Sequence, residues 1–120
     1  MFMDDQKVIQ VFLAAVDKWN LDDSSAASLV GSTSSMIGDW RSGNSTTTSE
    51  EVLARMLMVA RIRTALDIYW SESIAKEWII LPNRGDPYKG LSPVAYIAEH
   101  GWPGLFWVLC QVQAGAVGNF

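Results

Sequence analysis

Residues 23–42, with the sequence DSSAASLVGSTSSMIGDWRS, decide the fold of this chain. Ala27 is small enough to lie where two helices touch, and Gly31, four residues later, can adopt the positive φ that a tight turn between helices requires. Ile37 and Trp40 then follow at positions that face the core in the second helix of such a pair. This spacing predicts a helix-turn-helix over residues 23–42, with an unrelated pair of helices as the alternative.

Helical patterns continue on both sides of this motif. Before it, apolar residues three and four apart predict an amphipathic helix from about Asp4 to Trp19. After it, Thr48 and Glu51 have the capping-box spacing that starts a helix, and a long apolar segment follows from Val52 to Tyr69. Because no segment alternates apolar and polar residues as a strand does, the sequence predicts an all-α fold. Shorter helical segments complete the chain at Ile74–Leu81, at Ser92–Gly101 and from Pro103 to Gly115.

The long segment is apolar around most of its circumference, whereas a surface helix has a single apolar stripe. Apolar residues between Val52 and Ile68 fall on nearly every side of the predicted helix. We therefore expect this helix to lie at the centre of the fold or to be shared with a second copy, which would make the protein a homodimer or a larger assembly.

Composition and charge narrow the possible functions. Of the 120 residues 49% are apolar, six are tryptophans and only 18% are charged, so the chain has more apolar surface than a small domain easily buries. The net charge is −4, and a molecule of this charge has no long-range attraction for nucleic acid. No segment approaches the ~20 apolar residues of a membrane span, and we expect a cytoplasmic protein that does not bind membranes.

Residues suited to catalysis or metal binding are sparse. The one histidine, His100, precedes Gly101 at a predicted helix end, where a cation offsets the helix dipole. The one cysteine, Cys110, has apolar neighbours and is expected to be buried and inert, with no disulfide and no metal site. We therefore expect neither an enzyme nor a protein that needs a metal or a cofactor.

The second helix of the helix-turn-helix is the candidate DNA-binding element. The residues that it would present to DNA are mostly small and polar: Thr33, Ser34, Ser35, Asp39, Arg41 and Ser42. Arg41 is the only cation among them, although arginine is the side chain that most often reads guanine. Two interpretations stay open, a helix-turn-helix kept as a scaffold and one that binds operator DNA weakly as part of a multimer.

A second set of residues, in the C-terminal half, resembles a known family. In order along the chain these residues are Trp78, Pro82, Asn83, Gly90, Ser92 and Pro93. The series is similar to the toxin-binding domain of Xre/MbcA/ParS-type antitoxins, in which a Trp-containing helix end, Pro-Asn, a glycine loop and Ser-Pro precede a closing helix. The resemblance covers about Ile62 to Ala116, and the family carries an Xre-like helix-turn-helix in front, as residues 22–43 do here. The loop Arg84–Lys89 departs from the family pattern, which has a small, glycine-paired stretch there.

The resemblance implies two units and a function. The units are an N-terminal Xre-like helix-turn-helix bundle at residues 1–49, and a long helix with a small helical toxin-binding domain at residues 50–120. The implied function is that of an antitoxin in a type II toxin-antitoxin pair. Such a protein covers the active site of a RES-type toxin, which consumes NAD or transfers ADP-ribose from it, and can repress its own operon. A free-standing Xre-like transcription regulator without a toxin is the alternative.

The toxin-binding residues are expected in the last helix and in the tail after it. Outward-facing aromatic, polar and small residues are the candidates: Trp102, Phe106, Trp107, Gln111, Gly115, Ala116 and Val117. Leu105, Leu109 and Val112 are expected to face the core instead. Aromatic residues buried at an interface often carry much of the affinity of a complex, so the outward aromatics are the strongest of these candidates.

Overall fold

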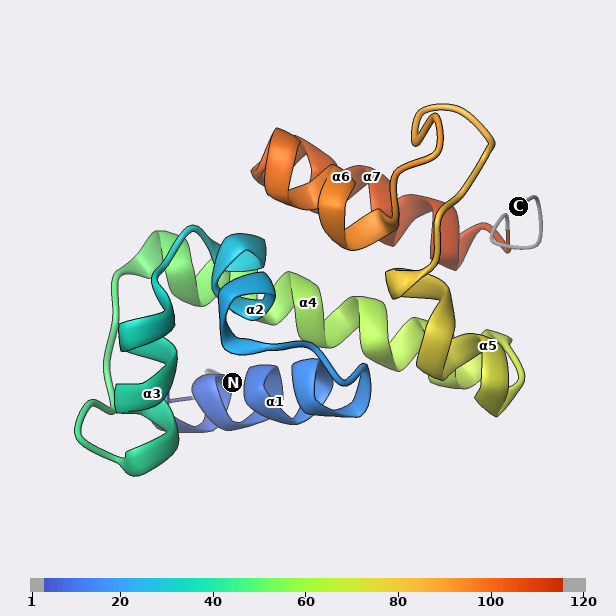
Figure 1. The fold of residues 1–120 in the computed structure, drawn as a ribbon. Coiled ribbons are helices and arrows are strands. Elements are labelled where there is room, and N and C mark those ends of the chain that lie inside the picture. The colour runs from blue at the N-terminus through green and yellow to red at the C-terminus, as the bar shows by residue number, and fades with distance from the viewer. Residues whose placement is uncertain (1–3, 116–120) are drawn as a thin grey trace.

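Helices make up most of residues 4–115, the part of the chain that this computed structural model describes (Figure 1). Within these residues no strand is present, so the predicted all-α class is confirmed. No helix among them has both the length and the apolar character to cross a bilayer. The elements are α1 (Asp5–Lys18), α2 (Asp23–Val30), α3 (Ser34–Ser42), α4 (Glu50–Tyr69), α5 (Glu72–Glu77), the 3₁₀ helix η1 (Trp78–Ile80), α6 (Pro93–His100) and α7 (Trp102–Gln113).

Polar side chains at the N-caps explain where most of these helices begin. In six helices the residue before the first turn is a Ser, Thr or Asp whose side-chain oxygen accepts a hydrogen bond from a backbone N–H of that turn. These residues are Asp4, Asp22, Thr33, Ser49, Ser71 and Ser92. The sequence thus encodes the helix starts locally, before any tertiary contact is considered.

The start of α4 differs by one residue from the predicted capping box. Ser49, rather than Thr48, is the N-cap, and its Oγ accepts a hydrogen bond from the backbone N–H of Val52 at 3.2 Å. Glu51 therefore lies in the first turn and forms an ion pair with Arg55 at 3.3 Å. Thr48 and Ser49 are both favourable N-cap residues, so the local sequence alone does not decide between them.

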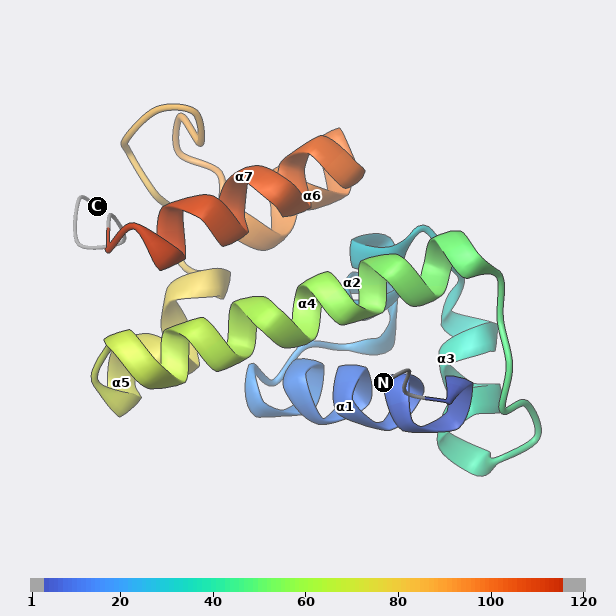
Figure 2. The ribbon, with the colours of Figure 1, turned by 180° about the vertical axis from the view of Figure 1, so that it is seen from behind.

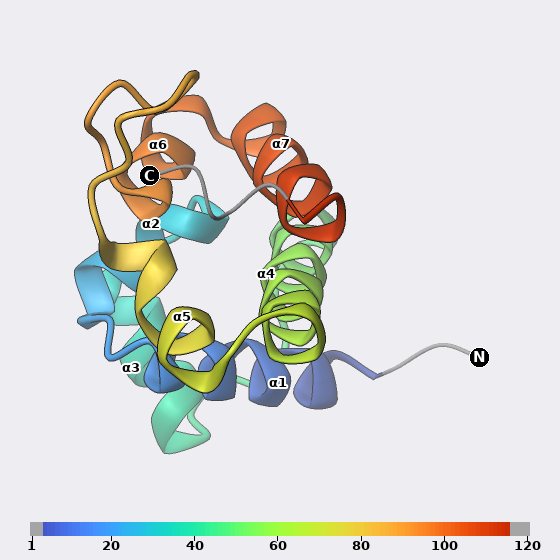
Figure 3. The same cartoon turned by 90° about the vertical axis from the view of Figure 1, so that its right-hand side faces the viewer.

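α4 lies at the centre of the molecule, as its apolar circumference predicts. α1 packs along one side of it and α7 along another, as the front, back and end views show (Figure 1, Figure 2 and Figure 3). Four of its side chains are at most 1% exposed: Met56, Val59, Ile62 and Leu66. One apolar core consequently includes residues from both 4–49 and 50–115.

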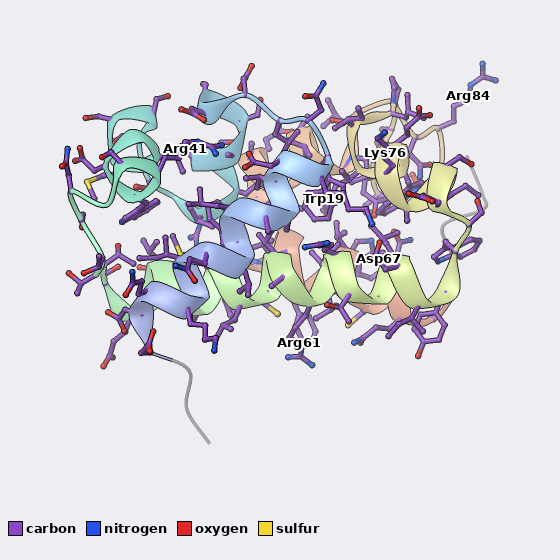
Figure 4. The ribbon with its side chains drawn as sticks, turned by 90° about the horizontal axis from the view of Figure 1, so that it is seen from below. Trp19, Arg41, Arg61, Asp67, Lys76 and Arg84 are labelled. Atoms are coloured by element: carbon purple, nitrogen blue, oxygen red, sulfur yellow. The ribbon has the colours of Figure 1, made fainter. Side chains whose placement is uncertain are left out.

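Polar contacts fasten the end of α1 to the second half of the chain. The indole Nε1 of Trp19 donates a hydrogen bond to the carbonyl oxygen of Ala75 in α5 at 3.2 Å. Nζ of Lys18 lies 2.6 Å from a carboxylate oxygen of Asp67 in α4, and Figure 4 shows Trp19 and Asp67 in this part of the molecule. Because Trp19 is buried, water does not compete for its hydrogen bond, and α1, α4 and α5 are held together at this point.

Replacing Ile62 by alanine should weaken the core strongly. The side chain is fully buried in α4, and its truncation leaves a cavity, so we expect the free energy of unfolding to fall by about 2–5 kcal/mol. The matched control is Ile68→Ala on the same helix, where the side chain is 67% exposed and the loss should stay below about 0.5 kcal/mol. Urea denaturation measures both variants, and equal losses would contradict the assigned faces of α4.

Candidate protein and nucleic-acid interfaces

α2 and α3 are two short helices joined by a turn at Gly31, in the segment where the sequence predicts a helix-turn-helix. Gly31 has φ 70° and ψ 34°, the left-handed conformation that glycine adopts without strain. Ala27, Ile37 and Trp40, the other residues that define the motif, are all buried. Their burial fixes the two short helices against the core and leaves the outer face of α3 exposed.

The outer face of α3 carries hydroxyl groups rather than positive charges. Ser34 and Ser35 are exposed in its first turn. Thr33 is the N-cap, and its Oγ1 accepts a hydrogen bond from a backbone N–H of that turn at 3.1 Å. At the other end, the Ser42 hydroxyl donates to the carbonyl oxygen of the half-buried Asp39 at 3.2 Å. Thr33 and Ser42 therefore have local structural roles, and Ser34 and Ser35 are the hydroxyls best placed to meet a ligand.

Arg41, the one cation of α3, is held by carboxylates from two other helices. Its Nη2 lies 2.7 Å from Oδ1 of Asp17 in α1, and its Nε lies 3.2 Å from Oδ1 of Asp23 in α2. The hydrogen bonds from Arg41 lower the pKa of Asp17, so this carboxylate is ionised at neutral pH. Contact between Arg41 and a phosphate would require the exchange of these bonds, and the two carboxylates would repel the phosphate.

α7 presents an exposed aromatic surface to solvent. Trp102, Phe106 and Trp107 are 41%, 55% and 45% exposed, and we call these three residues the α7 aromatic face. No residue from Gly101 to Gly115 is charged. The other side of α7 packs into the core, as predicted, through Leu105, Leu109 and Val112. α7 is therefore anchored by one side and apolar on the side that remains.

Cys110 also lies on the outer side of α7, so the prediction that it is buried is wrong. The prediction relied on the apolar character of its neighbours along the chain, and Leu109 is indeed buried. At about 3.6 residues per turn, however, consecutive residues of a helix point about 100° apart. The burial of one residue therefore does not predict the burial of the next.

The remaining toxin-binding candidates have different positions. The side-chain oxygen of Gln111 accepts a hydrogen bond from the hydroxyl of Tyr88, so Gln111 is half-buried and already bonded within the chain. Burial raises the pKa of Tyr88, which keeps its hydroxyl protonated and able to donate. Gly115 is exposed just beyond the end of α7. Ala116 and Val117 lie outside the described residues.

Three residues of the series that resembles a toxin-binding domain hold the region between η1 and α6 together: Trp78, Asn83 and Gly90. Trp78 is buried, and its ring meets that of Tyr88 edge to face, with centroids 6.1 Å apart. Asn83 is buried too, and its backbone N–H donates to the carbonyl oxygen of Leu91 at 3.0 Å. Its own carbonyl oxygen accepts a hydrogen bond from the N–H of Gly90 at 2.7 Å. Trp78, Asn83 and Gly90 thus close the loop that leads into α6.

The other members of the series mark the two ends of this loop. Pro82 is exposed at its start. Ser92 and Pro93 are the N-cap and the first residue of α6, as the sequence predicts. The segment Arg84–Lys89, which departs from the family pattern, contributes Tyr88 to the core. The unusual loop is therefore part of the packing that supports α6 and α7.

Arg55 has a structural role between the two candidate surfaces that sequence reasoning missed. A Cβ placed on Gly31 would lie 3.1 Å from its Nη1, and a Cβ on Gly101 would lie 3.4 Å from its Nη2. Gly31 is the turn between α2 and α3, and Gly101 is the turn between α6 and α7. The guanidinium group of Arg55 therefore packs against both turns, and most closely at Gly31, where an added Cβ would crowd it. The only signal in the sequence is a single arginine in an otherwise apolar stretch of α4.

Side chains that could bind a metal ion or act as a general acid or base are not clustered among the described residues. Among residues 4–115, no three His, Cys, Asp or Glu side chains are grouped so that they could hold a metal ion. His100 lies in the last turn of α6, as predicted, and its ring centroid is 4.3 Å from that of Tyr96.

Comparisons with known proteins identify no family for this chain. No protein-family model matches it, and no curated protein sequence matches it significantly. The outer face of α3 and the α7 aromatic face are therefore interpreted from their own residues.

Alanine at Gly31 and alanine at Gly38 should have opposite effects on stability. Gly31→Ala places a Cβ in the left-handed conformation, 3.1 Å from the guanidinium of Arg55, and we expect a loss of about 1–2 kcal/mol. Gly38 lies within α3 with no atom within 4 Å of an added Cβ, so Gly38→Ala should gain about 1 kcal/mol. Urea denaturation measures both variants. Stabilisation by Gly31→Ala would show that the turn is not strained as described.

Proposed function

We propose that this protein is an antitoxin that binds a RES-type toxin through α7 and covers its active site. The observation that carries the proposal is the α7 aromatic face, where three large aromatic side chains are exposed together on one helix. Single exposed apolar residues are common, but a group of this kind on a small protein marks a surface for a partner. The series from Trp78 to Pro93, similar to a toxin-binding domain, supports an antitoxin as the class of protein.

The chemistry of the α7 aromatic face favours a protein partner over a nucleic acid. α7 has no charged residue, so nothing on it attracts phosphate groups. Trp102 and Phe106 lie about one turn apart, which is the spacing of the anchor residues of helices that bind in apolar grooves. Aromatic side chains bury roughly 150–250 Å² each when they enter such a groove, and they dominate the energetics of many interfaces.

The packing of α7 supports inhibition by occlusion of the toxin's active site. Its inner side is already packed into the core, so the outer side can enter a cleft without rearrangement of the fold. A helix that is ordered before binding loses less conformational entropy on binding than a flexible segment does. We therefore expect the toxin to be blocked by contact, with its substrate NAD excluded from the active site.

Replacing Trp107 by glutamate should release the toxin while the antitoxin stays folded. The side chain is 45% exposed, so a charge is tolerated in the free protein, but that charge would lose its hydration in the interface. We expect the inhibition constant against a RES-type toxin encoded by the neighbouring gene to rise at least about 30-fold, which corresponds to about 2 kcal/mol. NAD consumption by the purified toxin is the measurement.

Leu81→Glu is the matched control, because Leu81 is 43% exposed but follows η1 and does not belong to α7. This variant should inhibit like the wild type. Circular dichroism establishes that each variant is folded, and deletion of residues 115–120 tests the tail separately. The proposal fails if folded Trp107→Glu and tail-deleted variants both inhibit fully, or if no RES-domain gene accompanies this one.

DNA binding is a second candidate function, supported by the geometry of α2 and α3. Recognition helices of this motif contact base edges with their N-terminal residues, and Ser34 and Ser35 are exposed at that end of α3. DNA binding would serve autorepression by an antitoxin, or the whole function of a free-standing Xre-like regulator. The ion pairs of Arg41 with Asp17 and Asp23 count against strong binding by a single copy. A neighbouring toxin gene distinguishes the two roles.

The isolated protein should bind duplex DNA only weakly, with a micromolar or larger dissociation constant at physiological salt. Asp17→Asn removes one negative charge and one partner of Arg41, so binding should tighten severalfold and depend more steeply on salt. Glu72→Gln is the control, since α5 lies at the other end of the molecule from α3 (Figure 1). Fluorescence anisotropy over a salt series measures these affinities. Nanomolar, sequence-specific binding by the wild type would contradict the charge argument.

A further inference from the structure

The outer face of α4 is open to a partner. Seen from behind, α4 is in full view between α7 and α1, and no other described element passes in front of it (Figure 2). Four residues at helical spacing follow one another along it, and we call them the outer stripe of α4: Glu50, Ala54, Leu57 and Arg61. Leu57 is 38% exposed near the middle of the stripe. Within these four residues an apolar centre therefore lies between an acidic residue and a basic residue, which we call the two ends of the stripe.

Glu50 and Arg61, at the two ends of the stripe, are the charged residues of α4 that form no ion pair among the described residues. The other four charged residues of α4 pair with one another, Glu51 with Arg55 and Arg63 with Asp67. Among residues 4–115, neither Glu50 nor Arg61 takes part in any ion pair. Both side chains are exposed, and Arg61 projects away from the body of the molecule (Figure 4). A cation and an anion are thus free, eleven residues apart, which is about three helical turns.

We propose that a second copy of this chain docks on the outer stripe, with the two α4 helices antiparallel about a two-fold axis. In an antiparallel pair about a two-fold axis, two positions face each other when the axis passes midway between them. Glu50 and Arg61 have the same midpoint along α4 as Ala54 and Leu57. When Glu50 of each copy faces Arg61 of the other, Ala54 of each copy therefore faces Leu57 of the other. The small alanine leaves room for the larger leucine, so the helices can approach closely at the axis. The two-fold symmetry makes each contact occur twice, with four ion-pairing residues and four apolar residues in register.

The order of residues favours a second copy over an unrelated partner. In the antiparallel arrangement, the basic end of the stripe on one copy faces the acidic end of the stripe on the other. The large Leu57 of one copy likewise faces the small Ala54 of the other, so the stripe is complementary to itself. An antiparallel register that pairs Arg61 with Asp67 is less favourable, because Asp67 already bonds to Lys18 at 2.6 Å and to Arg63 at 3.5 Å. The inference is independent of the toxin, because it uses α4 and not the α7 aromatic face.

Charge reversal at the two ends of the stripe tests this arrangement. Sedimentation equilibrium of the full chain at micromolar concentration should give a mass twice the 13.3 kDa of one copy. Arg61→Glu and Glu50→Arg each place like charges together at both ends of the interface, so each should raise the dimer dissociation constant about tenfold or more. The double variant restores opposite charges and should return to within about threefold of the wild type. Arg84→Glu, a reversal in the exposed loop after η1, is the control and should have no effect.

The same measurements include the results that would overturn the proposal. A monomer at every micromolar concentration, a dimer that Arg61→Glu leaves unchanged, or a double variant that dimerises no better than the single variants would each do so. Thermal melts followed by circular dichroism establish that the variants remain folded, as expected for exposed residues. Loss of the dimer with Leu57→Glu, in a folded protein, is the expected result at the apolar centre.

Discussion

The packing of α4 against two other helices of its own chain is the constraint on which the rest of the structure depends. α1 and α7 bury its sides, and the helix-turn-helix and the α6–α7 pair join the same apolar core. Arg55 reaches from α4 to the turn at Gly31 and the turn at Gly101. Because these two turns share one guanidinium group, the α2–α3 pair and the C-terminal helices are supported by the same helix.

This packing also determines which surfaces are left for partners. α7 uses its leucines and Val112 against the core, which leaves its aromatic residues outside. α4 packs most of its circumference against the core, and on the outer stripe that remains Glu50 and Arg61 form no ion pair with any of residues 4–115. Arg41 is the clearest case of a charge that is paired within the chain, since the carboxylates of Asp17 and Asp23 hold it. The α7 aromatic face is thus uncharged, whereas the arginine of α3 lies beside two carboxylates.

Much of the fold could be predicted from the sequence because its signals are local. N-cap residues such as Asp22 and Ser92 mark helix starts, and Gly31 supplies the turn of the helix-turn-helix. The alternation of buried and exposed residues in α7 also follows from helical periodicity, so the exposed aromatics were predictable. The DNA-binding candidates could be named in the same way, as the residues on the outer face of α3.

Contacts between segments far apart in the chain were decided only by the tertiary structure. Arg41 pairs with Asp17, Gln111 accepts a hydrogen bond from Tyr88, and Arg55 packs on two glycines, and none of these pairs has a signal in the local sequence. Cys110 does not belong to these cases, because its exposure on α7 follows from helical periodicity once Leu109 faces the core. The sequence by itself determined the helices and their apolar sides. Their mutual packing determined which polar side chains are bonded within the chain and which are free to bind a partner.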